Sequence, residues 1–287
     1  MRRPGASGGI IATAMANPSV PALLLAALVG AAPAAALAKS PSVRVVYETP
    51  KKPEHAPIAE RMRRERILED AADMLTMLKL PKLLTLRAAT CGESNAWYDG
   101  ETHILTFCYE LVGDFIKMAE QSGHFELTPD QAVTGPFLFI VLHETAHAVI
   151  HILAVPVLGQ EEDAADQLAV LAATKFGGDF AERMLRAAAF MYDHDSKTRE
   201  PGEADFADVH GLDRQRFYNV LCLAWGADPK LYDFAKDLGK LPEDRAQWCS
   251  EEYQQLRYAA RVLIRQHVDE KEIERARVRF ARSRFAR

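Results

Sequence analysis

The sequence has no excess of basic residues and only four cysteines, and beyond its N-terminal segment no apolar run is long enough to span a membrane. Its 287 residues include 35 Lys and Arg against 40 Asp and Glu, which gives a formal net charge of −5. A mildly acidic chain has no electrostatic attraction for a phosphate backbone, so nucleic acid is excluded as a partner. Apolar residues make up 48% and charged residues 26% of the chain. These values are ordinary for a globular protein and exclude a disordered or fibrous chain.

The four cysteines contain no CxxC spacing, which argues against a zinc site built from thiolates. Cys91 and Cys108 flank a turn-rich segment, and Cys222 and Cys249 flank a helical stretch. In an exported chain such cysteines are expected to form disulfides. Sequential pairing is the simplest of the three connectivities that four cysteines allow. Each bridge would contribute on the order of 3 kcal/mol in the chain-entropy model.

Residues 1–38 have the order of a secretory signal peptide. Arg2 and Arg3 come first, an apolar core follows at 22–29, and a small-residue cleavage site stands at 36–38. The apolar core is too short to span a bilayer of roughly 30 Å, so an uncleaved anchor is the less favoured alternative. No cysteine stands at the cleavage site, which argues against a lipid anchor there. We therefore expect an exported protein, periplasmic or secreted, with no stable membrane insertion after cleavage.

Translation could instead begin at Met15, which would remove both N-terminal arginines. The mature chain would have 33 basic residues against 40 acidic ones. The C-terminal segment 271–287 is locally basic, with seven basic residues against Glu272 and Glu274. A solvated, frayed helix is expected there, and a weak contact with anionic lipid or cell-wall polymer is the alternative.

Apolar periodicity and turn residues predict a few strands followed by many helices. Strands are expected at 43–48, 83–88, 96–98 and 103–107, the last two as a hairpin, and an amphipathic helix is expected at 58–80. From Leu111 onward helices are expected, with breaks at Gly123, Gly135, Pro156, Gly177, the stretch 193–211 and Pro229. This order indicates an α+β fold without internal repeats.

The residues that carry chemistry are concentrated in one apolar stretch, FLFIVLHETAHAVIHIL from Phe137. A helix that is apolar on nearly all sides is buried, so its polar side chains need partners or a role. His143 and His147 lie on one face, about 6 Å apart along the axis, where two imidazoles can bind one metal ion. Glu144 completes the HExxH pattern of zinc hydrolases, in which the Glu is the general base. His151 lies about 12 Å along the axis from His143, too far to bind the same ion.

The alternative for this helix is that the two histidines are ordinary buried residues whose hydrogen bonds are made within the protein. The acidic turn after Pro156 argues against it, because Glu162 would complete three protein ligands and leave the fourth position to water. Asp166, one helical turn later, would accept the free ring N–H of a ligand histidine. Two other interpretations remain: the acids only complement the helix dipole, or Glu161 takes the ligand position, although it has no Asp four residues later.

HETAH followed by EDAAD resembles the HExxH plus ExxxD arrangement of gluzincins, the group that includes thermolysin-like peptidases. The interval from His147 to Glu162 is shorter than in thermolysin itself. The stretches NAWYDGETHILTFCYEL, GQEEDAADQLA and HGLDRQRFYNVLC resemble an uncharacterised bacterial metallopeptidase family, over nearly all of the mature chain. The resemblance implies a zincin-like α+β fold with a small N-terminal sheet and hairpin before a mainly helical region.

These patterns and the resemblance together predict a division of the chain. Its parts would be a signal peptide (1–38), an N-terminal strand and linker (39–57), a zincin-like metallopeptidase domain (58–270) and a basic C-terminal tail (271–287).

Gluzincins need a donor that stabilises the oxyanion, and the resemblance points to His210 for this role. Asp205 and Asp208 are close enough in sequence to orient it, and Tyr218 is the second candidate. An ordinary loop histidine is the alternative for His210.

Asn95, Ala96, Trp97 and Tyr98 resemble the edge-strand segment that gluzincins use to hold the substrate backbone, and such a strand binds an extended peptide by β-addition. Ordinary core aromatics are the alternative for Trp97 and Tyr98.

The resulting hypothesis is a zinc-dependent metallopeptidase that acts on a peptide or protein substrate, with Zn²⁺ as cofactor and Glu144 as base. The first rival is a catalytically inert zinc-binding envelope protein on a zincin scaffold. The second is a helical envelope protein without a metal. Oligomeric state and cleavage preference cannot be predicted from these patterns.

Overall fold

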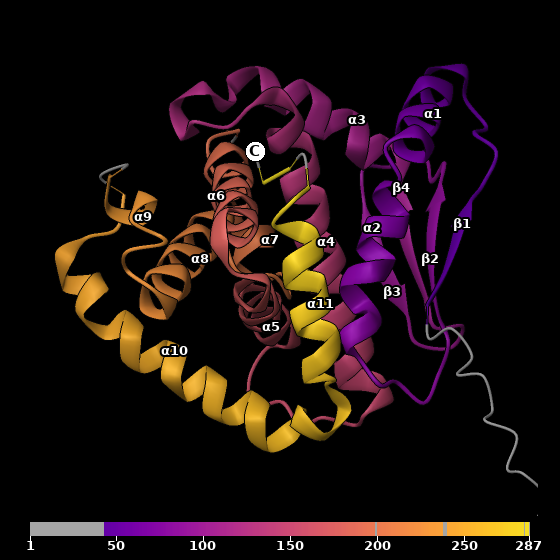
Figure 1. Ribbon diagram of the computed structural model, residues 1–287. Helices are drawn as coiled ribbons and strands as arrows, with labels where there is room; N and C mark the ends of the chain where they lie inside the picture. Colours follow the sequence, from indigo (N-terminus) through magenta and orange to yellow (C-terminus); the bar gives the residue numbers. More distant parts are fainter. Residues whose placement is uncertain (1–42, 199, 238–239, 284, 287) are drawn as a thin grey trace, which may run out of the picture. The chain divides into compact units, whose positions relative to one another are not determined.

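A four-stranded sheet lies on the N-terminal side of the structure, and helices form the rest of it (Figure 1). The computed structural model describes residues 43–198, 200–237, 240–283 and 285–286. The expected signal peptide lies outside the described residues. The described part confirms the α+β class and the order of a few strands before many helices.

The sheet contains the four expected strands, in the order β1-β2-β4-β3. Its strands are β1 (Val43–Tyr47), β2 (Leu84–Ala89), β3 (Ala96–Asp99) and β4 (Ile104–Cys108). β1, β2 and β4 are parallel, whereas β3 pairs antiparallel with β4 and forms one edge. The hairpin therefore leaves the outer side of β3 open, which matters for the site described below.

The single helix expected at 58–80 is wrong. The chain forms η1 (Pro53–His55), α1 (Ala56–Arg64), α2 (Ile67–Met74) and η2 (Leu75–Met77) instead. Arg66 separates α1 from α2 with a φ of 58°, a left-handed conformation that an α-helix cannot contain. Both helices bury an apolar face, so the break re-aims the chain and lets each face reach the core.

The helical region begins directly after β4. Its elements are α3 (Tyr109–Met118), η3 (Ala119–Phe125), α4 (Pro129–Ile152), α5 (Glu161–Phe176), α6 (Gly178–Asp195), α7 (Glu203–Phe206), α8 (Asp213–Ala227), α9 (Phe234–Asp237), α10 (Glu243–Leu263), η4 (Arg265–His267) and α11 (Glu270–Phe280). α4 passes through the middle of the molecule and packs against the sheet hairpin, α3, α5 and α6 (Figure 1). It is the central element of the fold.

α4 begins with a capping box in which the Thr128 side chain accepts from the Gln131 amide and the Gln131 side chain accepts from the Thr128 amide. The expectation that no segment after the N-terminus is long and apolar enough to span a membrane is wrong for α4. By length and composition α4 could do so, but 83% of its apolar window is buried inside the protein. The break expected at Gly135 is wrong, because α4 continues through it. Glycine is needed there for close approach: a Cβ on Gly135 would collide with the Cβ of Ala187 on α6.

Two disulfides, Cys91–Cys108 and Cys222–Cys249, confirm the sequential pairing. The first ties the segment before β3 to the end of β4, and the second joins α8 to α10. Residues 271–280 of the basic segment, expected to be a frayed helix, belong to α11, whose Ile273 and Phe280 side chains are buried.

We expect Gly135→Ala to destabilise the protein by at least about 1 kcal/mol, because overpacking costs about 1–3 kcal/mol. The sign is informative, since Ala normally stabilises a helix interior relative to Gly by roughly 1 kcal/mol. Urea unfolding would measure the change. Gly123→Ala is the matched control, because no atom lies within 4 Å of its added Cβ. Equal stability of the two variants would contradict the close packing of α4 on α6.

Candidate metal centre

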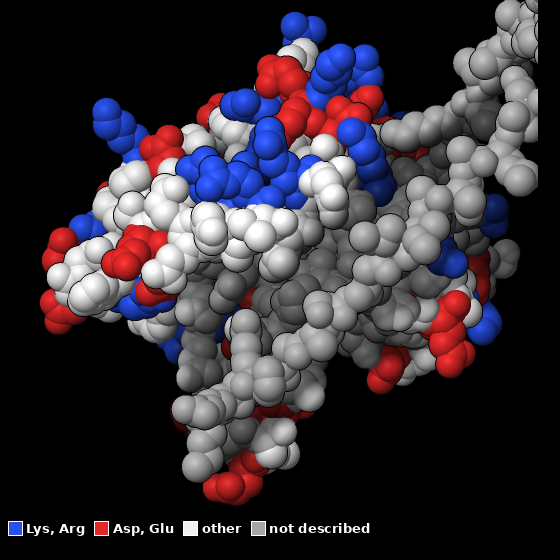
Figure 2. Space-filling model, turned by 90° about the horizontal axis from the view of Figure 1, so that it is seen from below, with Lys and Arg blue, Asp and Glu red and all other residues white. Residues whose placement is uncertain are grey.

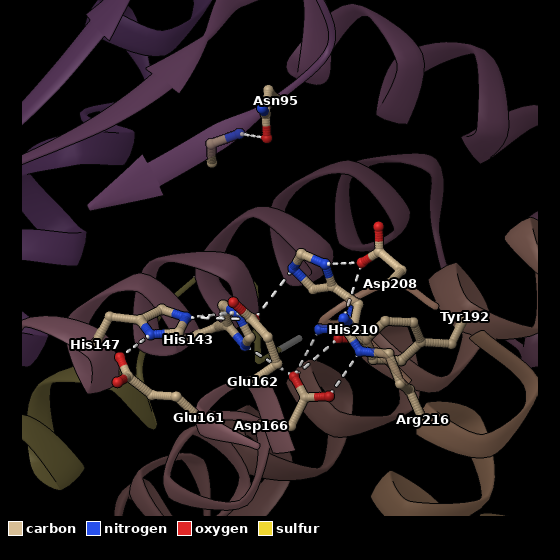
Figure 3. A network of polar contacts seen from close by, with 11 residues as sticks. Asn95, His143, His147, Glu161, Glu162, Asp166, Tyr192, Asp208, His210 and Arg216 are labelled. Carbon is tan, nitrogen blue, oxygen red and sulfur yellow. Dashed lines mark hydrogen bonds and ion pairs between the residues drawn. The ribbon is translucent and has the colours of Figure 1, made fainter. Parts of the chain in front are cut away.

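Two consecutive helices bring the HExxH residues and the acidic turn together (Figure 3). The chain turns back after α4 through Gly159, whose φ of 123° suits glycine, and α5 starts beside the end of α4. Oε2 of Glu162 lies 3.1 Å from Nε2 of His143 and 3.4 Å from Nε2 of His147. The two Nε2 atoms are 3.2 Å apart. Three ligand-type atoms therefore converge on one point.

The contacts of the two Nδ1 atoms determine whether each Nε2 atom carries a hydrogen or a lone pair. Nδ1 of His143 lies 2.8 Å from Asp166 Oδ1, and Nδ1 of His147 lies 2.8 Å from Glu161 Oε1. An ionised carboxylate only accepts hydrogen bonds, so both Nδ1 atoms carry the hydrogen. In the neutral rings, both Nε2 atoms then present lone pairs to each other and to the Glu162 oxygen. Such an arrangement needs a cation, either protons or a metal ion, at its centre.

The spacing of the three atoms fits a metal ion. Ligand atoms that each lie about 2.0–2.1 Å from a tetrahedral ion are separated from one another by roughly 3.3 Å. The ligand atoms of His143, His147 and Glu162 all lie within 4.8 Å of one another. Within the described ranges, the other such group is Cys91, Cys108 and Glu110, and its sulfurs are bonded to each other. The HExxH helix and the acidic turn therefore form the candidate metal centre.

The pKa values of these groups reflect the same convergence. Burial alone lowers the pKa of His147, but the carboxylates of Glu162 and Glu161 outweigh it and raise the pKa to about 9. Burial also opposes the charged form of His143, and Asp166 and Glu162 raise its pKa above the usual value. The histidines hold the pKa of Glu162 well below its usual range, against the effect of burial. The centre thus attracts positive charge strongly.

Two further helices hold Asp166. Arg216 of α8 donates from Nε and Nη2 to the two oxygens of Asp166, at 2.7 and 2.9 Å, and Tyr192 of α6 donates to Oδ1 at 3.1 Å. Burial raises the pKa of Asp166, but the hydrogen bonds from His143 and Arg216 reverse this and hold the pKa well below its usual range. Asp166 therefore stays ionised and fixes the orientation of His143.

Glu144 lies next to the metal ligands, and its side chain is buried. Burial raises the pKa of Glu144, and the neighbouring His143 and His147 act in the opposite direction. The main-chain N–H of Tyr98 on β3 also interacts with the Glu144 carboxylate. The edge strand and the HExxH helix therefore meet at this carboxylate.

The alternation along β3 determines which main-chain groups face away from the sheet. Asn95 O accepts from Cys108 N, so the odd-numbered residues of the strand pair with β4. The main-chain groups of Ala96 and Tyr98 then face outward. The Asn95 side chain bonds to the Ala96 amide, and Figure 3 shows it apart from the polar network around Glu162.

His210 reaches the centre, whereas the hydroxyl of Tyr218 bonds elsewhere. Nε2 of His210 lies 3.1 Å from Oε2 of Glu162, and its Nδ1 lies 2.8 Å from Oδ1 of Asp208 (Figure 3). The bond to Glu162 raises the pKa of His210. The Tyr218 hydroxyl accepts from Arg214 at 3.2 Å.

Asp205, expected to help orient His210, accepts from the Gly202 amide. His151, which was excluded as a ligand, lies 3.0 Å from the Tyr98 hydroxyl and so links α4 to β3.

Three residues of the centre were not predicted: Arg216, Tyr192 and the role of Glu161. Glu161 stands in the predicted turn, but its bond to His147 depends on the angle at which α5 begins. Arg216 and Tyr192 contact Asp166 across sequence separations of 50 and 26 residues. A charged residue in a helix carries no sequence signal for such a partner.

Comparison with known proteins places these observations in a family. A family model described as "Putative metallopeptidase" matches residues 47–264, which include every residue of the centre. Neither the curated proteins nor the solved structures contain a match.

Protons and a metal ion compete for this centre, so we expect the affinity of the metal-free protein for Zn²⁺ to rise with pH. The pKa of His147 is about 9, so below this pH its Nε2 carries a proton that the metal ion must displace. Each displaced proton raises the affinity about tenfold per pH unit. Titrations with Zn²⁺ between pH 6 and 9, in a non-chelating buffer, would measure this. An affinity independent of pH would contradict the expected protonation of the two histidines.

Proposed function

The chain belongs to the family of putative metallopeptidases, and we propose that it is an exported, zinc-dependent peptidase of the gluzincin type. The convergence of two Nε2 lone pairs and one carboxylate oxygen, with Glu144 beside them, is the observation that supports this proposal most strongly. Two imidazoles and one carboxylate are a common ligand set for catalytic zinc. The zincin-like description of the fold rests on this site and on the helix that carries it.

In the proposed mechanism His143, His147 and Glu162 hold the ion. Zinc bound there would polarise the attacking water and the scissile carbonyl. Glu144 accepts the proton of the attacking water and passes it to the leaving amine. Burial suits Glu144 to this role, because a raised pKa brings a carboxylate nearer to neutral pH. Asp166 keeps His143 in the tautomer that presents Nε2.

His210 is the proposed oxyanion donor. Glu162 and Asp208 contact its two ring nitrogens and raise its pKa, which favours the imidazolium form that donates from Nε2. Tyr218 remains the second candidate, although its hydroxyl contacts Arg214.

The substrate would lie along β3. The outward main-chain carbonyls of Ala96 and Tyr98 can accept hydrogen bonds from an extended peptide, whereas the Ala96 amide is bonded to the Asn95 side chain. Asn95 and Trp97 complete this edge. The Tyr98 amide also contacts Glu144, so a peptide on this edge would lie close to the proposed base.

Two disulfides are consistent with an oxidising compartment, and with the signal peptide expected at 1–38 they support a periplasmic or secreted location. The alternative function is a catalytically inert zinc-binding envelope protein. The presence of Glu144 favours the peptidase, because a structural metal site has no use for a base.

We expect Glu144→Gln to retain zinc and lose about 10²–10⁴-fold in hydrolysis, the usual contribution of a general base. Digestion of a peptide library, with zinc measured in the same samples, tests this. Glu60→Gln, an exposed substitution of the same chemistry on α1, should keep wild-type activity. A Glu144→Gln variant as active as wild type would remove the mechanism. Stoichiometric zinc without any cleavage by the wild type would favour the inert binding protein.

We expect Glu162→Ala to weaken Zn²⁺ binding more than about 100-fold, beyond the 10–100-fold cost of losing a group that only supports a ligand. Asp163→Asn, in the same helical turn, should keep wild-type affinity. Zinc content after dialysis, with circular dichroism to confirm folding, measures both variants. A wild-type protein that neither contains nor takes up zinc would indicate a structural protein without a metal.

A further inference from the structure

An apolar cavity of about 280 Å³ lies behind the metal helix. Leu142 and Val149 of α4 line one wall, on a side of the helix turned away from His143 and His147. The opposite wall comes from α10 and the segment after it, including Ala260. The cavity opens to solvent on one side, and its volume is close to the lower end of the roughly 300–1,000 Å³ of ligand pockets.

The rim of this cavity carries four cations: Lys175, Arg257, Arg261 and Arg265. Glu270 is the one acidic residue in the lining. In the part of the chain that the structure describes, none of the four cations forms an ion pair with a carboxylate within 4 Å. Arg245, also on α10, shows the contrast, because it pairs with Glu252 at 2.6 Å.

The four cations are concentrated at one place on the surface. Figure 2 shows Lys and Arg gathered on the side that lies lowest in Figure 1, where α10 runs. Burial and the nearby Arg257 both lower the pKa of Lys175. A helix C-terminus favours cations, which accounts for Arg261 and Arg265 at the end of α10. It does not account for Lys175, which comes from α5.

We propose that this cavity binds a free, single-chain anionic amphiphile such as a medium-chain fatty acid. The acyl chain would lie among the apolar side chains, and the acid group would lie at the four cations. Ligand sites are commonly apolar with a few convergent polar groups, and an apolar cavity stays dry and takes apolar ligands. The positive rim selects the charge of the head group. This inference does not depend on the peptidase activity.

Calorimetric titration of the full chain with laurate, below its critical micelle concentration, tests the proposal. We expect saturable binding of one laurate, and at least about tenfold weaker binding of dodecyltrimethylammonium, which has the same chain length and the opposite charge. Equal affinity for the two amphiphiles, or no binding of laurate, would overturn the proposal. Binding only to anionic phosphatidylglycerol vesicles would also overturn it, because it would show a contact with a lipid surface.

Variants separate the two parts of the site. Arg257→Ser combined with Arg261→Ser should weaken laurate binding about tenfold, and Ala260→Leu should fill the cavity and abolish binding. Arg275→Ser is the matched control, since Arg275 is an exposed arginine on α11 outside the rim. Thermal unfolding confirms that each variant is folded. An equal effect of all the variants, or a dimer formed through this face in place of laurate binding, would refute the site.

Discussion

The hydrogen bond from His143 Nδ1 to Asp166 is the interaction on which the centre depends. It places the hydrogen on Nδ1, and so the lone pair of Nε2 points at His147 and Glu162. Without it, the two rings could satisfy each other as donor and acceptor, and no cation would be needed between them. Asp166 can perform this role only while it is ionised, and inside a protein an isolated carboxylate would take up a proton. Arg216 prevents this, so α8 takes part in a site whose ligands lie on α4 and α5.

The two ligand histidines are supported unequally. The His143 and Asp166 side chains are 4% and 9% exposed, whereas Glu161, the partner of His147, is 50% exposed. A hydrogen bond between charged groups is stronger in the buried, less polar surroundings, and solvent and salt screen the exposed one. His143 is therefore the fixed side of the centre, and His147 lies on its solvent side.

The sequence predicted the local part of this structure. The four-residue spacings of His143 and His147 and of Glu162 and Asp166 follow from helix periodicity, and the strands follow from alternation. Contacts between distant segments were not predictable. Arg216 reaches Asp166 only because α8 packs on α5, and the sequence does not show that packing. Gly135 was predicted to be a break because the sequence does not show that Ala187 of α6 packs against it. Backbone conformation at Arg66 was missed for the same reason, since the core and not the local sequence requires the bend.

The apolar side chains of α4 face two different environments, the packed core on most sides and the cavity on one side. On most sides the helix is covered by the hairpin, α3, α5 and α6, and its apolar residues form the core. At Leu142 and Val149 it borders the cavity, where its apolar residues form a wall. Thr145, on the same wall, satisfies its hydroxyl within the helix by donating to Val141 O, and so adds no unpaired polar group to the cavity. The orientations of the two ligand rings are set by the bonds that Asp166 and Glu161 make to them. The centre is thus held by polar contacts on a helix that is otherwise held by apolar ones.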